Sequence, residues 1–359
     1  MSEIENWIRL AKLELPKRAV ALADHFGGAD EVFQASVKEM ASVEDISIRT
    51  AERFHAMAAE PVDRELAALE KLNARVVTYR DPNYPANLRQ TYDPPVVLFV
   101  LGEIRLEDRF AVGIVGTRTP SEYGRSMTMK IGRDLAQRGL CIVSGAARGI
   151  DTVAHIAALQ GGGRTIAVLG SGLDIPYPYE NRGLLIKIAE NGAVMSEFVP
   201  GTKPDAWRFP VRNRLVSGLS LGVLVVESRI NGGAMITATL AAEQGRDVYA
   251  IPGPTDNDTS EGPHNLIKEG AKLVEGAEDI LVELGIEVES TRPERPSIPD
   301  NLTPEQRTVI QVLNLHPKHV DEIIAECKLT PAVANSTLTL LEMLGLARRV
   351  PGNAYVRAV

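Results

Sequence analysis

The sequence predicts an α/β protein: an extended Rossmann-like domain with a parallel sheet, flanked by an N-terminal helical domain and a C-terminal winged-helix domain. The first observation is a series of short apolar runs between residues 110 and 251, with helical stretches between them. Strands that helices cover on both faces have this composition, and their alternation with helices is typical of doubly wound sheets. The second is the order of elements after residue 301, three helices followed by a hairpin, which is the winged-helix arrangement.

Residues 1–60 are expected to form the helical domain, of the SAM-like or helix-hairpin-helix-like kind. Trp7 and Ile8 belong to an apolar series with helical spacing, and Pro16 stands where a second helix can begin, since proline is tolerated in a first turn. Gly27 and Gly28 would end that helix, because glycine accepts the left-handed conformation of a helix cap. Small units of this kind sometimes hold a DNA backbone and more often pack against a partner.

Residues 61–286 are expected to form the Rossmann-like, DNA-binding domain. Prolines break its first part into extended pieces, among which residues 96–101 are predicted to be a buried strand. The parallel strands are predicted at residues 110–115, 141–143, 165–169, 193–195, 223–226 and 248–251. The clearest helices between them are predicted at residues 121–138 and 234–244.

The C-terminal part begins with a proline-rich linker at residues 287–300, and the winged-helix domain is expected at residues 301–359. Its would-be recognition helix, residues 331–344, contains no lysine or arginine. Helices that enter the major groove normally carry basic or amide side chains. Arg348 and Arg349 in the hairpin suffice for a weak backbone contact, so a protein-interaction or auxiliary role is favoured for this domain.

Composition favours a cytoplasmic protein. The 359 residues include two cysteines, Cys141 and Cys327, which is too few for a disulfide framework, and Cys141 is expected to be a buried small hydrophobe. Glu3 and Glu5 stand where a secretory signal would be basic, and no apolar run reaches membrane-spanning length. We therefore expect no membrane association.

The charge distribution excludes a basic surface spread over a whole segment. The net charge is −8, and residues 111–280 carry 17 basic and 18 acidic side chains. A site for a polyanion must therefore be a local cluster of cations.

Glycine-rich loops follow the first three predicted parallel strands, which start at residues 110, 141 and 165. Because the carboxyl ends of parallel strands lie at one edge of the sheet, these loops would form one rim, where ligands of open α/β sheets bind. Arg118 offers a planar fork suited to phosphate, and glycine lets the backbone approach an anion closely. The residues of these loops that we expect to bind DNA are Gly116, Thr117 and Arg118 in the first loop, Ser144, Gly145, Arg148 and Gly149 in the second, and Gly170 and Gly172 in the third.

Two well-known phosphate sites are excluded. The dinucleotide fingerprint G-x-G-x-x-G does not follow the first strand, and the P-loop pattern G-x-x-x-x-G-K-[ST] does not occur. Instead, residues 207–214 mix aromatic rings with cations, as grooves for single strands do, since any base can stack on an aromatic ring. The residues concerned are Arg208, Phe209, Arg212, Asn213 and Arg214. The alternative is that Arg212 or Arg214 pairs internally with Glu197 or Glu227.

No catalytic, cofactor or metal site is expected. Asp151 and His155, four residues apart on one predicted helix, could form a catalytic pair, but no Ser or Cys nucleophile has an evident base, so a structural role is favoured for His155. The six histidines and two cysteines show no spacing typical of metal ligands.

Taken in order, these motifs resemble those of the DprA/Smf family of DNA-processing proteins. The resemblance covers roughly residues 80–275. The family pattern runs V-G-x-R, S-G-x-A-x-G-I-D-x-x-A-H, Y-P, S-E, F-P-x-R-N-R, a lone Glu that ends a strand, T-A, P-G and G-x-N-x-L-I-x-x-G-A. In this sequence the corresponding segments are residues 115–118, 144–155, 177–178, 196–197, 209–214, Glu227, 237–238, 252–253 and 262–271. The last segment departs from the pattern at one place, since its asparagine, Asn265, stands one position later.

The resemblance implies a non-enzymatic protein that binds single-stranded DNA in a pocket of the Rossmann-like domain. It also implies a homodimer formed through that domain, and loading of the RecA recombinase onto incoming strands in natural transformation. The DNA-binding arginine of the family maps onto Arg118. Tyr179 stands where a basic residue commonly follows Y-P, which implies a weaker phosphate contact and base stacking there. Arg208, with Lys203 a little earlier, takes the place of the basic residue that usually precedes F-P.

Two other functions fit the sequence less well. A nucleotide phosphoribohydrolase has a similar glycine-rich rim with the motif P-G-G-x-G-T-x-x-E; the nearest string, residues 231–238, lacks the first proline and the spaced glutamate. A transcription regulator that senses a nucleotide would need a basic recognition helix, which residues 331–344 do not supply.

Overall fold

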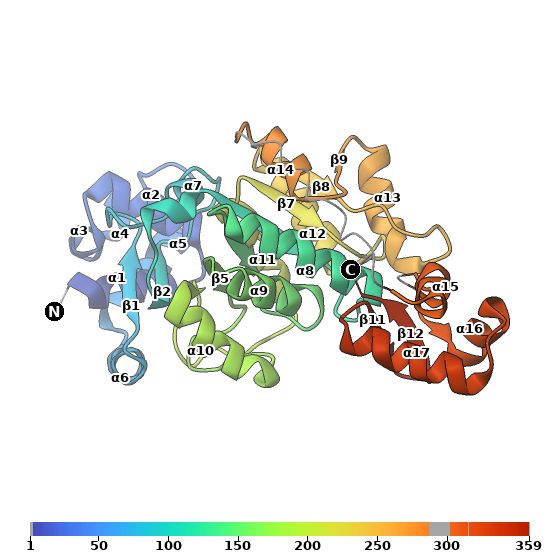
Figure 1. Cartoon of the computed structure of the whole chain (residues 1–359). Helices are drawn as coiled ribbons and strands as arrows, with labels where there is room; N and C mark the ends of the chain where they lie inside the picture. Colours follow the sequence, from blue (N-terminus) through green and yellow to red (C-terminus); the bar gives the residue numbers. More distant parts are fainter. Residues whose placement is uncertain (1–2, 287–301, 315, 359) are drawn as a thin grey trace. The chain divides into compact units, whose positions relative to one another are not determined.

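The computed structural model describes residues 3–286, 302–314 and 316–358. Its contacts divide the chain into two compact units: Met1–Pro120 with Thr128–Leu284, and Ser121–Met127 with Gly285–Val359. The expected linker at residues 287–300 lies outside the described residues. Mixed α/β structure, with a large and mostly parallel sheet, a helical N-terminus and a winged helix, confirms the fold class (Figure 1).

The N-terminal part of the first unit is helical. Its apolar helix faces enclose Trp7 and Phe54, which are fully buried. The second helix ends as expected at Gly27, which adopts φ 100° and donates its N–H to the Ala23 carbonyl. Helices continue past residue 60, where extended structure was expected, because residues 63–72 are rich in Leu, Ala, Glu and Lys, which are good helix formers. The helices are α1 (Glu3–Lys12), α2 (Pro16–Phe26), α3 (Ala29–Gln34), α4 (Val37–Met40), α5 (Ile48–Ala56) and α6 (Asp63–Leu72).

In the described part of the chain, nine strands form one large sheet in the order β1-β2-β6-β5-β4-β3-β7-β8-β9. Strands β1 and β2 are antiparallel additions to an otherwise parallel sheet. The chain passes from β3 outward to β5 and β6, then returns to place β7 on the other side of β3. The strands are β1 (Arg75–Thr78), β2 (Val97–Gly102), β3 (Ala111–Val115), β4 (Cys141–Ser144), β5 (Thr165–Val168), β6 (Ala193–Ser196), β7 (Gly222–Val225), β8 (Asp247–Ala250) and β9 (Lys272–Leu273).

The six predicted parallel strands therefore exist, each within one residue of its predicted bounds. The strand β1 was not predicted, because its four residues begin with a charge and only Val77 is buried.

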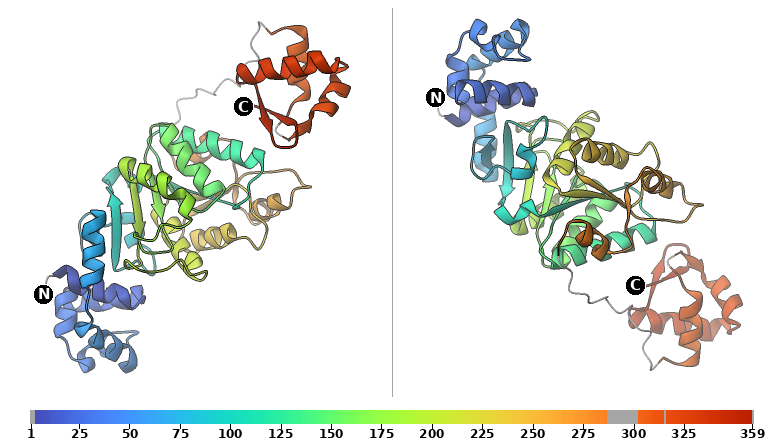
Figure 2. Two further views of the ribbon diagram at one scale, coloured as in Figure 1. Left: turned by 90° about the horizontal axis from the view of Figure 1, so that it is seen from below. Right: turned by 90° about the horizontal axis from the view of Figure 1, so that it is seen from above.

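Helices cover the sheet and are visible around it in Figure 2. Helix α9 packs on β3, β4 and β5, while α10 packs on β2, β5 and β6. Helix α11 packs on β3, β4 and β5 and against α12, which covers β7 and β8. The helices are α7 (Ala86–Arg89), α8 (Glu122–Gln137), α9 (Ile150–Gln160), α10 (Arg182–Asn191), α11 (Arg208–Leu219), α12 (Gly233–Glu243), α13 (Glu261–Lys268) and α14 (Ala277–Glu283).

Two of the hydrophobic clusters among the described residues show what holds this unit together. One joins the N-terminal helices to the sheet, since Trp7 and Phe54 belong to the same buried cluster as Phe99 and Leu169. The other lies where strands such as β4 and β7 meet α11 and α12. The helical part and the sheet therefore share buried apolar surface, which stabilises both, at roughly 25 cal/mol per Å² removed from water.

The second unit contains the winged helix. The small sheet has the order β10-β12-β11, all antiparallel, and a separate core encloses Ile323, Leu338 and Leu341. Helix α15 begins with a capping box in which Thr303 and Gln306 cap each other's backbone. The elements are α15 (Pro304–Val312), β10 (Lys318–His319), α16 (Val320–Cys327), α17 (Pro331–Met343), β11 (Ala347–Val350) and β12 (Ala354–Arg357).

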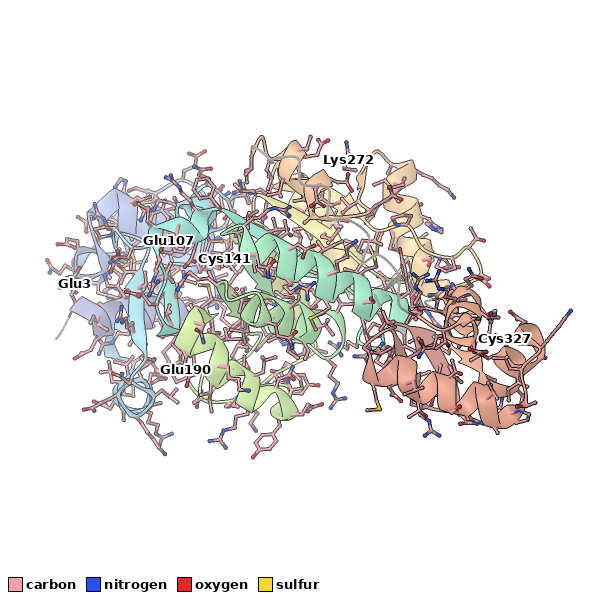
Figure 3. All side chains as sticks on the ribbon, in the orientation of Figure 1. Glu3, Glu107, Cys141, Glu190, Lys272 and Cys327 are labelled. Atoms are coloured by element: carbon pink, nitrogen blue, oxygen red, sulfur yellow. The ribbon has the colours of Figure 1, made fainter. Side chains whose placement is uncertain are left out.

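Cys141 and Cys327, labelled in Figure 3, are both buried and unpaired. Burial raises the pKa of the Cys141 thiol well above its ordinary value, so this side chain behaves as the small hydrophobe expected. Every helix in the described part of the chain is too short or too polar to span a lipid bilayer.

Candidate nucleic-acid interface

The loop after β3 lies at the point where the strand order reverses, between β3 and β7. The Thr117 N–H donates to the Glu227 carbonyl at 2.7 Å, and the Ile150 N–H donates to the Thr117 carbonyl at 3.1 Å. Residues after β3, after β7 and at the start of α9 are thereby joined by backbone hydrogen bonds. These hydrogen bonds fix the loop after β3, the first of the three loops predicted to form the rim, at the position where open α/β sheets bind their ligands.

Gly149, at the N-terminus of α9, allows these loops to approach closely. It has φ 79°, and a Cβ placed there would lie 2.3 Å from the Thr117 carbonyl oxygen. Only glycine meets both conditions without strain. Gly116 is nearly as confined, because a Cβ there would lie 2.6 Å from the side chain of Ile150.

Arg118 is an exposed cation of this rim. Its guanidinium carbon lies 5.7 Å from the centre of the Phe209 ring, within the range of a cation–π contact. Among the described residues, no carboxylate forms an ion pair with Arg118. The charge of Arg118 is therefore held in place by an aromatic face and left available to an anion.

Phe209 also contacts a second ring. The rings of Tyr177 and Phe209 lie 5.5 Å apart at an angle of 38°, and the Tyr177 side chain is 42% exposed. Gly170 lies beneath Phe209, where a Cβ would come within 2.9 Å of the ring. Tyr177, Phe209 and Arg118 thus place two aromatic faces and a cation in sequence, which is what stacking of bases beside a phosphate requires.

Arg212, in contrast, is buried. One of its terminal nitrogens donates to the Gly145 carbonyl at 2.5 Å and to the Val168 carbonyl, and Nε donates to Asn213 at 3.2 Å. Burial lowers the pKa of Arg212 to about 10, Asp151 opposes that shift, and Arg118 adds to it. The side chain ties α11 to the ends of β4 and β5, so its role is to hold the rim together.

Asp151, in the first turn of α9, holds the loop after β4 through hydrogen bonds to its backbone. Its carboxylate accepts hydrogen bonds from the backbone N–H groups of Gly145 and Ala147, at 3.2 and 3.3 Å. Burial raises the pKa of Asp151, and Arg212 counteracts that rise. Ser144 is fully buried and donates to the Ile114 carbonyl at 2.6 Å, so it joins β4 to β3 and does not face the rim.

The remaining predicted residues differ in how available they are. Arg148 is exposed and pairs with the exposed Glu180. Tyr179 is 72% exposed, and Lys203 is exposed. Gly172 is buried and donates its N–H to the Thr202 carbonyl at 2.9 Å, so it shapes the loop after β5.

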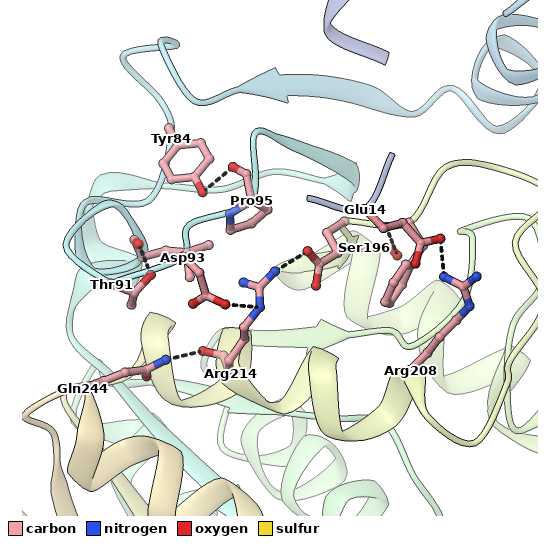
Figure 4. A network of polar contacts seen from close by, with 12 residues as sticks. Glu14, Tyr84, Thr91, Asp93, Pro95, Ser196, Arg208, Arg214 and Gln244 are labelled. Carbon is pink, nitrogen blue, oxygen red and sulfur yellow. Dashed lines mark hydrogen bonds and ion pairs between the residues drawn. The ribbon is translucent and has the colours of Figure 1, made fainter. Parts of the chain in front are cut away.

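Arg208 and Arg214, also on α11, differ from Arg212 in having acidic partners. Arg214 is buried and pairs with Asp93 at 3.1 Å and with Glu197, the internal pairing weighed from the sequence. Arg208 pairs with Glu14 at 2.5 Å, which joins the N-terminal helices to α11. Figure 4 shows Arg214 beside Asp93 and Arg208 beside Glu14. Neither guanidinium is available as an unpaired charge.

Asn213, between Arg212 and Arg214 in the sequence, is partly exposed, and its side-chain oxygen accepts a hydrogen bond from Arg212 Nε. The rim residues therefore divide into two kinds. The exposed ones that can meet a ligand are Arg118, Arg148, Tyr179, Lys203 and the partly exposed Phe209 and Asn213; the supporting ones are Gly116, Thr117, Ser144, Gly145, Gly149, Gly170, Gly172 and Arg212.

Sequence reasoning missed two residues that complete the rim. Tyr177 was noted as part of the Y-P motif, but its contact with Phe209 comes from a segment 32 positions away. Glu180, the partner of Arg148, carried no signal because a lone surface carboxylate is unremarkable in a sequence.

His155 lies in the interior. It is fully buried, and its Nδ1 is 2.7 Å from Thr165 Oγ1. Burial lowers its pKa to about 3, and the charge of Arg212 adds to that shift, so the ring is neutral at physiological pH. Within the described ranges, no group of three or more His, Cys, Asp or Glu side chains is placed to hold a metal ion.

The fold and the rim define an α/β protein that presents an exposed arginine and a pair of aromatic rings at the carboxyl edge of a mostly parallel sheet. The family model for DNA recombination-mediator protein A matches residues 75–285, and the DprA winged helix domain matches residues 293–353. The chain belongs to the DprA/Smf family of DNA-processing proteins.

Among curated relatives, protein Smf of Escherichia coli K12 is 38% identical over 99% of this chain and 96% of its own length. The DNA processing protein DprA of Streptococcus pneumoniae R6 is 47% identical over 56% of this chain and 72% of its own length. The alignment with the Escherichia coli relative therefore extends over both units, whereas the Streptococcus relative aligns with a shorter segment at higher sequence identity.

Solved structures agree with this assignment. The crystal structure of DprA from Streptococcus pneumoniae matches with a TM-score of 0.70 and 37% identity, over 79% of this chain and 98% of that one. A structure of DNA processing protein A from Helicobacter pylori, described for its single-stranded DNA binding mode, matches with a TM-score of 0.53 and 30% identity, over 59% of this chain and 95% of that one.

Proposed function

We propose that this protein binds single-stranded DNA at the rim formed by the loops after β3, β4 and β5 and the start of α11. The observation that carries the proposal is the unpaired Arg118 guanidinium beside the Phe209 and Tyr177 rings. Arg118 would contact a phosphate, and the rings would stack on bases, which gives affinity without sequence preference. The single-stranded DNA binding described for the Helicobacter pylori relative supports it.

Of the surrounding residues, some would contact the DNA directly and others would hold the loops in position. Lys203 and Arg148 would add phosphate contacts, and Tyr179, exposed at the same edge, would offer a further stacking face. Arg212 and the glycines would position the loops. Arg214 and Arg208, included in the expected set, are left out of direct contact because both are paired with acidic side chains.

The biological role we propose is that of a cytoplasmic mediator without catalytic turnover. It would protect incoming single strands and load the RecA recombinase onto them in natural transformation, acting as a homodimer through the Rossmann-like domain. Membership of the DprA/Smf family supports this role.

The test is fluorescence anisotropy of a labelled oligo-dT strand, titrated with protein at two salt concentrations, with unlabelled duplex as competitor. We expect the protein to prefer single strands to duplex and to bind more weakly as salt rises, because phosphate contacts release counterions. For single strands the logarithm of the binding constant falls with the logarithm of the salt concentration with a slope of about −0.7 per neutralised phosphate. The absence of binding at low salt, or a preference for duplex, would contradict the proposal.

A further inference from the structure

A cavity of about 250 Å³ lies between the N-terminal helices and the sheet, on the Glu197 side of α11. Its apolar walls come from both parts, with Leu10 and Leu15 on one side and Val96 and Phe198 on the other. Trp207, 53% exposed, lines it as well. This volume is below the roughly 300–1,000 Å³ of pockets for drug-sized ligands, and it far exceeds the 10–15 Å³ or so that one water needs.

The cavity is separate from the DNA rim. Trp207, Val211 and Arg214 line it and are spaced four and three residues apart, so they share one face of α11. Phe209 and Arg212, which belong to the rim, lie on another face of the same helix. One helix therefore presents different side chains to two different sites.

Two residues that line this cavity each carry a buried polar atom without a hydrogen-bond partner among the described residues: Nη1 of Arg214 and Oε1 of Glu197. Both side chains line the cavity, and both are more than nine-tenths buried, with exposures of 7% and 9%. They are the unused ends of one ion pair, in which Arg214 Nη2 contacts Glu197 Oε2. A buried donor and a buried acceptor without partners each cost free energy of about 1–3 kcal/mol, more when charged, and a ligand that supplies both partners removes that cost.

The charges at the cavity select against an anion. Glu14, Asp93 and Glu197 line it, whereas Arg214 is the cation in its lining. Burial raises the pKa of Glu197, and Asp93 and Glu14 raise it further, while Arg214 lowers it. A ligand that brought a further negative charge would meet the same repulsion.

From these observations we propose that the cavity is a second ligand site, which takes a small, flat, uncharged molecule carrying an N–H donor beside a C=O acceptor, such as the base of a nucleoside. Neither Glu197 Oε1 nor Arg214 Nη1 is exposed to the cavity in this structure, so both side chains would turn toward it on binding. The donor would then bond to Glu197 Oε1 and the acceptor to Arg214 Nη1, while the ring contacts Trp207 and the apolar walls. This site does not depend on the proposed function, because it uses no residue of the DNA rim.

The experiment titrates the full-length protein with thymidine, N3-methylthymidine and thymidine 5′-monophosphate, followed by ligand-observed NMR and calorimetry. Thymidine is expected to bind. N3-methylthymidine lacks the N–H donor, and its affinity should fall about tenfold, as expected for losing one hydrogen bond to a charged group. The monophosphate should also bind more weakly than thymidine, because of the carboxylates.

Variants locate the binding. Ala11→Phe and Val211→Phe each add bulk to the lining and should abolish thymidine binding. The control is Ile4→Phe: Ile4 lies on the same helix as Ala11 but is 45% exposed and outside the lining, so this change should not affect thymidine binding. Arg118→Ala should also leave thymidine binding unchanged, which separates this site from the DNA rim. Thermal melting would establish that each variant is folded. No binding of thymidine, equal binding of its N3-methyl derivative, or full binding by both folded filling variants would overturn the proposal and leave a hydrated cavity.

Discussion

At the scale of single residues, the rim depends on which cations have partners. Arg118, Arg208, Arg212 and Arg214 are equally basic in the sequence, yet the structure gives them three different roles. Arg118 is exposed beside Phe209, Arg212 is buried against backbone carbonyls, and Arg208 and Arg214 are paired with acids. An arginine that already has a carboxylate partner gains little from a phosphate, so the expected energetic contributions differ accordingly.

The first prediction concerns Arg118. The Arg118→Ala variant should bind oligo-dT at least about tenfold more weakly, because a hydrogen bond to a charged group contributes about 1.5–3 kcal/mol. The slope of the logarithm of the binding constant against the logarithm of the salt concentration should also become shallower by about 0.7, the value for one phosphate contact with a single strand. Stability should stay within about 0.5 kcal/mol, since the side chain is exposed. Anisotropy titration and thermal melting measure the two effects.

The matched control is Arg133→Ala, which removes an arginine of the same helix-and-sheet domain that is paired with Asp134 on α8. It should bind DNA as the unmodified protein does. Unchanged affinity in Arg118→Ala, or an equal loss in both variants, would refute the assignment of the rim.

The second prediction concerns Gly145. A Cβ at this position would lie 2.6–2.7 Å from the guanidinium of Arg212, so Gly145→Ala must displace that buried side chain. We expect a loss of about 1–3 kcal/mol of unfolding free energy, as for overpacking of a core, and weaker DNA binding because the rim loosens. Gly183→Ala, in the exposed first turn of α10 with no atom within 4 Å, should be neutral or stabilising by up to about 1 kcal/mol. Denaturant unfolding of both variants tests this; equal stability would mean that Arg212 is not fixed there.

At the scale of elements, the helix α9 joins the rim to the interior. Its N-terminus begins beside Gly149, Asp151 in its first turn holds the loop after β4, and His155 one turn later contacts Thr165 on β5. The same helix therefore fixes a loop at the surface and packs a polar side chain into the sheet. A change of charge at His155 would act on an element that carries the rim.

The third prediction uses the pKa of His155, which burial lowers to about 3. Because the unfolded chain binds a proton near pH 6.5 and the folded one does not, stability is present above that pH and is lost as the pH falls below it. Between pH 6.5 and 5 the loss is about 2 kcal/mol. The His155→Gln variant lacks this titration, so its unfolding free energy should fall less over that interval. Parallel acid-dependent slopes in denaturant unfolding would contradict the prediction.

At the scale of the whole molecule, two units of the same chain carry different surfaces. The first carries the rim with its unpaired arginine. The second carries a winged helix whose helix α17 has no lysine or arginine and exposes Val333, Leu340 and Met343. The contrast supports a DNA site on the first unit and an auxiliary role for the second.

The fourth prediction follows from that division. Replacing both Arg348 and Arg349 with alanine should reduce oligo-dT affinity less than Arg118→Ala does, because Arg349 already contacts Asn353 and, in the described part of the chain, neither arginine has a cation–π contact like that of Arg118 with Phe209. The two variants are compared in one anisotropy series at low salt. The opposite ranking would move the DNA site to the winged helix.

Much of the fold was predictable from local signals. The parallel strands were found because burial on both faces requires continuous apolar runs, and Gly27 was recognised as a helix cap because its left-handed backbone disfavours other residues. The helix α6 and the strand β1 were missed, since short elements at the margin of a domain show weak periodicity. The rim loops were located from their glycines, but their division into contacting and supporting residues was not.

The sequence by itself determined the order of elements, the rim at the carboxyl edge of the sheet and, through its motifs, the DprA/Smf family. Only the tertiary structure decided which charges remain free. Glu197 and Asp93 are brought to Arg214, and Glu14 to Arg208, from positions distant in the chain, whereas Tyr177 and Phe209 are brought to Arg118. Ion pairing and ring contact depend on distances of a few ångströms between segments, and local sequence patterns carry no information about those distances.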